Sequence, residues 1–316
     1  MIDFFASLYA SVGNKYSLLR QIKFYTFLRL GISVLYNMLI PIMMRVTSSK
    51  KDFSLVCQNS GREKIIVSLT SFNKRIGRVW IVIESILRQT CKPDMIILWL
   101  SKEEFPSMEC LPKKLLRLQK RGLIINLREG NLMSHKKYYY TLMEYPNDHM
   151  ITIDDDIIYP SDFIASLLKG HKQYPDAVIS RFAFKVKYDE RGGLLPYAVW
   201  SSVMINKLTP PSCDVFFGSG GGTFFPSNVL GEEAKNITLA MDKCKYADDV
   251  WLNTMCRLNG KKVVVINSLF SFLPVLNRND FKLVSINNGQ GLNDKQISDL
   301  QDYYLKHFNV NPYCKK

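Results

Sequence analysis

Three aspartates follow directly on an apolar run in the stretch Ile151-Thr152-Ile153-Asp154-Asp155-Asp156-Ile157-Ile158-Tyr159-Pro160. Residues 150–153 have the composition of a strand buried on both faces. Adjacent carboxylates repel one another, so a strand that ends in three of them is destabilised unless a cation offsets the charge. Carboxylate oxygens suit Mg²⁺ or Mn²⁺, which is typically held by one or two carboxylates together with substrate phosphates. The stretch therefore predicts a metal and diphosphate site; the alternative is an ordinary helix N-terminus capped by Asp156 or Ser161.

Strands alternate with helices on the amino-terminal side of this stretch. Apolar runs at 65–69, 95–100 and 123–127 predict three further buried strands. Apolar residues at helical spacing within 76–87, 115–118 and 138–144 predict the helices between the strands. This alternation is typical of an α/β fold with a mostly parallel central sheet flanked by helices. Ligands of such sheets bind beyond the carboxyl ends of the strands, where the three aspartates are expected to lie.

Five segments in a fixed order carry a family resemblance: Ser68-Leu69-Thr70-Ser71-Phe72, Glu84-Ser85-Ile86-Leu87-Arg88-Gln89-Thr90, Lys92-Pro93-Asp94-Met95-Ile96-Ile97-Leu98-Trp99-Leu100-Ser101, His135-Lys136-Lys137-Tyr138 and the three aspartates. In this order the region 64–160 resembles the nucleotide-sugar-binding half of the GT-A glycosyltransferases, particularly family-2-like enzymes of bacterial surface polysaccharide biosynthesis. The resemblance implies a Rossmann-like GT-A fold and a nucleotide-sugar donor.

The resemblance also implies roles for individual residues. Thr70, Ser71 and Phe72 would line the nucleotide base, and Lys136 or Lys137 would approach the diphosphate. Asp154 would lie near the nucleotide and hold the metal together with Asp156, with Asp155 in the same clamp.

Two features of the second half complete the predicted site. Glycines lie between aromatic residues in Phe216-Phe217-Gly218-Ser219-Gly220-Gly221-Gly222-Thr223-Phe224-Phe225, where backbone can approach a ligand closely; the alternative is a flexible turn. In the resembling enzymes such a loop lines the donor-sugar and acceptor pocket, which implicates Gly220 and Gly221. Asp248 and Asp249 open a predicted helix that runs to about residue 258. We predict Asp249, with Asp248 second, as the base of an inverting transfer; the alternative is stabilisation of the helix dipole.

The amino-terminal segment, residues 1–57, differs from the rest in being apolar and basic. Its charge-free run from 30 to 44 is shorter than the roughly twenty residues that span a bilayer, and Pro41 interrupts it. Apolar residues interleaved with cations predict an amphipathic helical segment at a membrane surface; a helical hairpin packed on the main domain is the alternative. We divide the remainder, 58–316, into a nucleotide-sugar half (58–160) and an acceptor and catalytic half (161–316).

The net charge of +14 is compatible with nucleic acid, an anionic membrane or phosphorylated substrates. The chain carries no recognisable nucleic-acid-binding module, so we expect no nucleic-acid partner. Seven scattered cysteines without a CxxC pair predict free thiols in a reducing cytosol. The sequence thus predicts a Mn²⁺- or Mg²⁺-dependent glycosyltransferase at the cytoplasmic face of a cell membrane, acting on a glycan or lipid-linked glycan. A nucleotidyltransferase of related fold and a non-enzymatic basic binding protein are the alternatives.

Overall fold

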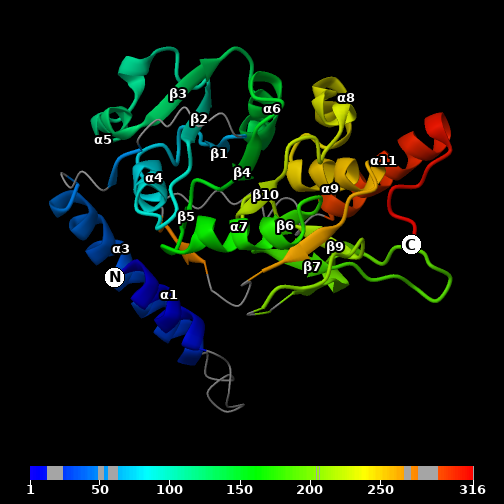
Figure 1. Ribbon diagram of the computed structural model, residues 1–316, viewed down its shortest axis with the longest axis horizontal. Coiled ribbons are helices and arrows are strands. Elements are labelled where there is room, and N and C mark those ends of the chain that lie inside the picture. Colours follow the sequence, from blue (N-terminus) through cyan, green and yellow to red (C-terminus); the bar gives the residue numbers. More distant parts are fainter. Residues whose placement is uncertain are drawn as a thin grey trace.

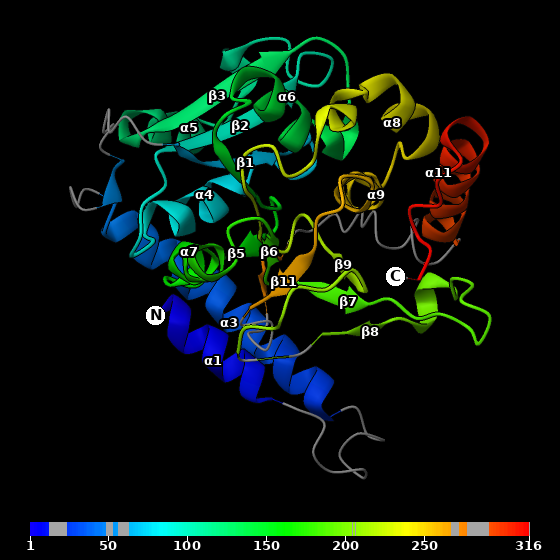
Figure 2. The same ribbon diagram turned by 45° about the vertical axis from the view of Figure 1, so that its right-hand side comes forward.

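A computed structural model of the protein describes residues 1–12, 24–48, 53–55, 63–203, 205, 207–266, 272–276 and 291–315. Within them, a seven-stranded sheet runs through the centre in the order β11-β6-β10-β4-β1-β2-β3 (Figures 1 and 2). Its strands are β1 (Ile65–Thr70), β2 (Met95–Ser101), β3 (Leu123–Arg128), β4 (His149–Thr152), β6 (Val178–Ser180), β10 (Thr223–Phe225) and β11 (Val263–Val265).

The sheet is mostly parallel. β1 pairs in parallel with both β2 and β4, β2 with β3, and β6 with β11. Only β10 runs antiparallel among these strands, between β4 and β6. Two small sheets accompany the central one: β5 (Ile157–Ile158) with β12 (Leu273–Pro274), and β8 (Ser201–Ser202), β7 (Ala183–Lys185) and β9 (Val215–Phe217). The predicted α/β class with a mostly parallel sheet is confirmed.

Helices cover both faces of the sheet, as the alternation of buried side chains along the strands requires. On one face, Val67 and Leu69 of β1 pack with α4 (Val79–Leu87) and α7 (Phe163–Gln173). On the other, Ile66 of β1 and Trp99 of β2 lie under α6 (Lys136–Glu144). The main domain also contains α5 (Lys113–Leu116), α8 (Ile237–Lys243), α9 (Asp248–Leu258) and α11 (Leu292–Phe308), of which α8 and α9 pack against α11.

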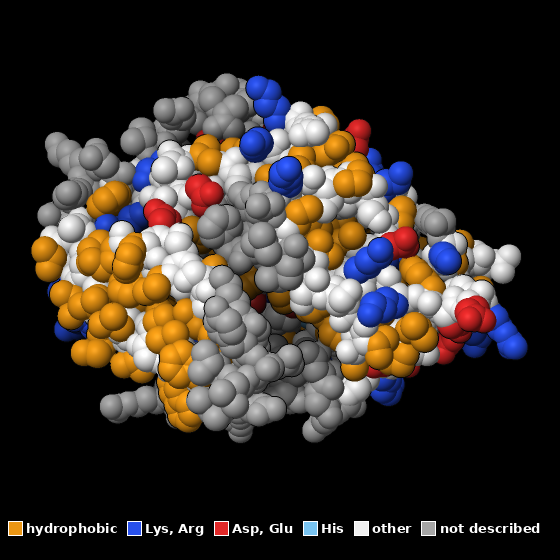
Figure 3. Space-filling model, turned by 90° about the horizontal axis from the view of Figure 1, so that it is seen from below, with side chains coloured by type: hydrophobic (Ala, Val, Ile, Leu, Met, Phe, Trp, Pro, Cys, Tyr) orange, Lys and Arg blue, Asp and Glu red, His pale blue; other side chains and the backbone are white. Residues whose placement is uncertain are grey.

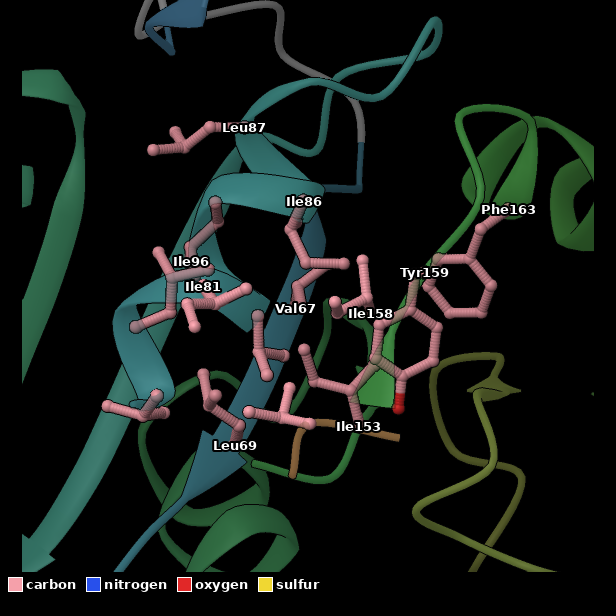
Figure 4. Packing of buried hydrophobic residues seen from close by; sticks show 14 of the residues in the cluster. Val67, Leu69, Ile81, Ile86, Leu87, Ile96, Ile153, Ile158, Tyr159 and Phe163 are labelled. Atoms are coloured by element: carbon pink, nitrogen blue, oxygen red, sulfur yellow. The ribbon is translucent and has the colours of Figure 1, made fainter. Parts of the chain in front are cut away.

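The core anchors the chain on both sides of the three aspartates. Ile153, directly before them, has no exposed surface, and Ile158 and Tyr159, shortly after them, are each 1% exposed. Figure 4 shows these side chains packed against Val67 of β1 and the inner face of α4. The aspartates therefore occupy a short turn whose two ends are fixed in the hydrophobic core.

The described residues of the amino-terminal segment include two helices, α1 (Ile2–Ser11) and α3 (Phe24–Val46), which lie against each other and against the main domain (Figure 1). Helix α3 continues through Pro41, so the proline does not end the helical segment at this point. It is long and apolar enough to cross a membrane by length and composition. The expected domain boundary at 57/58 lies outside the described residues. The six cysteines that the structure describes all carry free thiols.

Candidate functional site

A cavity of about 340 Å³ lies where β1 and β4 end and α9 begins. Nearly all of the residues predicted from the sequence line its wall. Among the lining residues are Thr70, Ser71, Phe72, Arg75, Glu104, Asn131, Ser134, Lys136, Lys137, Asp154, Asp155, Asp156, Gly220, Asp248 and Asp249. The structure thus brings together segments that are separated by up to 179 positions in the chain (70 to 249).

The three aspartates do not share one environment. The side chains of Asp154 and Asp156 are 44% and 29% exposed, whereas that of Asp155 is 7% exposed. The carboxylate of Asp155 is bound by two protein side chains: Ser71 Oγ donates to its Oδ2 over 2.6 Å, and Arg75 Nη1 lies 2.9 Å from its Oδ1. The carboxylates of Asp154 and Asp156 are therefore the more exposed ones in the cavity.

Negative charge is concentrated around Asp156. Burial and repulsion from Asp154 raise the pKa of its carboxyl to about 7, although Arg75 Nη1 lies 2.8 Å from its Oδ2. Burial and the neighbouring carboxylate both disfavour the charged form of Asp156, and a divalent cation would favour it. Among the described residues no three His, Cys, Asp or Glu side chains are grouped as a complete metal site. Asp154 and Asp156 instead fit a cation that takes one or two carboxylates and completes its shell with phosphate and water.

The acidic pair at the start of α9 forms the opposite side of the cavity. Ser219 holds both carboxylates: its Oγ donates to Asp248 Oδ2 and its N–H donates to Asp249 Oδ1, each over 2.6 Å. Burial alone would raise the pKa of Asp248, but the ammonium of Lys137 and the adjacent His135 outweigh it and lower that pKa to about 2. Burial and repulsion from Asp248 raise the pKa of Asp249 to about 7. The two acids therefore differ in their readiness to take a proton near neutral pH.

Lys137 joins the two acidic groups. Its Nζ lies 3.0 Å from Asp154 Oδ1 and 3.1 Å from Asp248 Oδ2, and its side chain is only 4% exposed. Burial would lower its pKa, but the surrounding carboxylates, Asp154 first, raise it instead. The neighbouring Lys136, predicted as a diphosphate contact, also lines the cavity; its Nζ donates to Asn131 Oδ1 over 2.8 Å, and burial lowers its pKa.

The glycine-rich segment allows the two sides of the cavity to approach. The Cα of Gly220 lies so close to Asp154 that an added Cβ would be 1.8 Å from Oδ2 of that carboxylate. The main chains of the two residues are also hydrogen-bonded, since the N–H of Asp154 donates to the carbonyl of Gly220 over 3.1 Å. The structure places Gly221 away from the lining, against Phe182, whose Cβ would be 2.3 Å from an added methyl group.

Several lining residues were missed by the sequence reasoning. Arg75 lies in the loop that follows β1 and was not among the predicted site residues. Glu104 and Asn131 each lie three residues beyond the end of a parallel strand, β2 and β3 respectively. The carboxyl ends of parallel strands meet at one edge of a sheet. The positions of Glu104 and Asn131 just after two predicted strands could therefore have identified them as site residues.

Comparison with known proteins found similar solved structures but no similar sequence. No protein-family model matches the chain, and no curated protein sequence matches it. One similar solved structure is a 4-diphosphocytidyl-2C-methyl-D-erythritol synthase, with 11% identity and a TM-score of 0.42 over 73% of this chain and 99% of that chain. Another is a mannosyltransferase from Pyrobaculum calidifontis in complex with GDP-Man and Mn²⁺, with 14% identity and a TM-score of 0.46 over 86% of this chain and 72% of that chain.

Proposed function

We propose that this protein is a divalent-metal-dependent glycosyltransferase of the GT-A type. It would move a sugar from a nucleotide-sugar donor to a glycan acceptor, free or lipid-linked, with inversion at the anomeric carbon. One observation carries the proposal. A single cavity holds the available carboxylates of Asp154 and Asp156 on one side and the proton-accepting carboxylate of Asp249 on the other.

The first side of the cavity suits a nucleoside diphosphate. Asp154 and Asp156 would hold Mn²⁺ or Mg²⁺, which when bound neutralises the diphosphate and stabilises it as a leaving group. Thr70 is the last residue of β1, and Ser71 and Phe72 follow it; these three residues would line the base. At about 340 Å³ the cavity falls within the range of sites that enclose a small organic ligand.

The second side suits removal of a proton from an acceptor hydroxyl. As that oxygen forms its bond to the anomeric carbon, the bond from the anomeric carbon to the diphosphate breaks and its electron pair leaves with the phosphate oxygen. The hydroxyl proton passes to Asp249. A pKa of about 7 keeps a substantial fraction of this carboxylate unprotonated at neutral pH while leaving it basic enough to accept the proton. Asp248, with its pKa near 2 and its contact to Lys137, is a weak base by comparison.

The proposal is tested first by donor binding. UDP-, GDP- and TDP-sugars, each with and without Mn²⁺, are screened by thermal shift, since a ligand at about 100 times its Kd stabilises the fold by roughly 2.7 kcal/mol. We expect one nucleotide class to give a Mn²⁺-dependent shift. Asp156→Asn should abolish that dependence, whereas Asp176→Asn, at a side chain that is 94% exposed, should leave it unchanged.

Two results would contradict the proposal. The first is a folded wild-type protein that shows no shift with any donor. The second is release of pyrophosphate from a nucleoside triphosphate and a sugar 1-phosphate, which would identify a nucleotidyltransferase. Once donor and acceptor are known, the anomeric configuration of the product, read by NMR, tests inversion.

A further inference from the structure

Helices α1 and α3 expose large apolar side chains along one side of the molecule. Figure 3 shows hydrophobic side chains gathered there. On α3 the most exposed of them include Phe27 (68%) and Met38 (61%). The complete set, which we call the N-terminal apolar face, is Met1, Phe4, Phe24, Phe27, Leu28, Leu30, Val34, Leu35, Met38, Leu39, Ile42 and Val46. A gathering of exposed apolar side chains of this size marks an interaction site with another protein or a membrane.

The opposite side of α3 is buried against the rest of the protein. Ile32, Tyr36, Ile40 and Met44, spaced four residues apart, are buried at 8% exposure or less. Tyr36 Oη and Asn37 Nδ2 both donate to the carbonyl of Pro274, over 2.9 and 3.0 Å. Residues 32–44 of the helix are therefore held along one side by α1 and the main domain. A helix fixed along one side in this way does not present its whole circumference to lipid, so a position in the plane of a membrane fits it better than a spanning one.

Charge identifies the occupant of this face. Residues 1–52 contain seven lysines and arginines against two acids, Asp3 and Asp52. Asp3 is itself used internally, because its carboxylate accepts hydrogen bonds from Ser161 N–H and Oγ over 2.8 and 2.7 Å. Apolar side chains in a segment with an excess of five positive charges (seven cations less two acids) complement an anionic phospholipid surface. A second copy of the chain would instead bring the basic segments of both copies together, which is unfavourable.

We propose that α1 and α3 bind in the plane of an anionic phospholipid bilayer, with the N-terminal apolar face in the interfacial region. Hydrogen bonds connect α3 to the aspartate turn of the candidate site. Pro274 accepts the hydrogen bond from Tyr36, and the N–H of the next residue, Val275, donates to the carbonyl of Asp156 over 2.7 Å. Binding at the bilayer thereby fixes the aspartate turn relative to the lipid surface. If the proposed function holds, this position favours a lipid-linked acceptor; the membrane binding itself does not depend on that function.

The test is co-sedimentation of the full chain with vesicles. We expect binding to vesicles of phosphatidylglycerol and phosphatidylcholine, weaker binding to phosphatidylcholine alone, and a decrease with rising salt. The double variant Phe27→Ser/Met38→Ser removes two exposed side chains of the face and should lower the partition coefficient by about tenfold or more. The matched control is Leu305→Ser/Phe308→Ser, which changes side chains of similar exposure (51% and 59%) on α11 and should bind as the wild type does.

Three outcomes would overturn the proposal. One is folded wild-type protein that does not sediment with anionic vesicles. Another is an equal loss of binding in the α11 control, which would make the association unspecific. The third is a dimer in solution that Phe27→Ser/Met38→Ser dissociates while vesicles remain unbound, which would assign the face to a second copy. Thermal shift with Mn²⁺ and donor, measured on the same variants, reports separately on the proposed enzymatic function.

Discussion

A methyl group at residue 220 should displace the carboxylate of Asp154. An added Cβ would lie 1.8 Å from Asp154 Oδ2, whereas ordinary contact begins at 3.4 Å, so the oxygen has to move by about 1.6 Å (3.4 less 1.8). Metal ligation tolerates displacements of only about 0.2 Å, and an error of about 1 Å at a reacting centre costs on the order of 10²-fold in rate. We expect Gly220→Ala to weaken Mn²⁺-dependent donor binding and transfer by on the order of 10²-fold.

Stability should change much less than binding in this variant. The Asp154 side chain is 44% exposed and can turn into the cavity, which sacrifices its contact with Lys137. A partly exposed ion pair contributes about 0–1 kcal/mol, so the free energy of unfolding in urea should fall by about 1 kcal/mol or less. The control is Gly77→Ala, where an added Cβ meets nothing within 4 Å. If folded Gly220→Ala binds donor and Mn²⁺ as tightly as the control does, Asp154 is not a metal ligand.

The remaining predictions concern Lys137 and the acidic pair. Lys137→Met leaves buried Asp248 without its cation and should lower the free energy of unfolding in urea by about 3–5 kcal/mol. Lys136→Met, equally buried, removes a hydrogen bond to Asn131 and a longer ion pair, 3.7 Å, to Glu104, whose side chain is 17% exposed. It should cost less, and equal losses would contradict the proposed bridge. Asp249→Asn should slow transfer by about 10²–10⁴-fold without loss of the Mn²⁺-dependent thermal shift; full turnover would place the base elsewhere. Because Asp249 acts unprotonated with a pKa of about 7, kcat/KM should fall about tenfold per pH unit below that pH and level off above it, and a flat profile would exclude the assignment.

The first four strands were predictable because each contains a run of mostly apolar residues. A strand buried on both faces reads as a continuous run, and the run at 95–100 became β2, Met95–Ser101. β10 was not predicted. It has three residues, too few for periodicity to register, and its place between β4 and β6 depends on pairing with segments far away in the chain. Nothing local in Thr223–Phe225 specifies that partner.

The site was predictable only in its outline. The parallel-sheet rule places the ends of β1 and β4 at one edge, which accounts for Ser71 and the aspartates lying together. The sequence did not separate Lys136 from Lys137, because that choice depends on the angle at which α6 lies on the sheet. Neighbouring helical residues point about 100° apart, so Lys137 reaches Asp154 and Asp248 while Lys136 turns toward Asn131.

The segment from Gly218 to Gly222 explains why the two acidic groups form one site. We had interpreted its glycines as allowing close approach to a ligand, but here they allow close approach within the protein. Ser219 holds Asp248 and Asp249 through its hydroxyl and its N–H, and the next residue, Gly220, accepts a hydrogen bond from the N–H of Asp154. Two consecutive residues thus set the separation between the proposed metal ligand and the proposed base. A larger side chain at 220 would alter that separation directly. The short separation brings carboxylates together, and Lys137 offsets the repulsion between Asp154 and Asp248. The cavity is therefore positioned by the main chain of one short segment and stabilised by one buried charge.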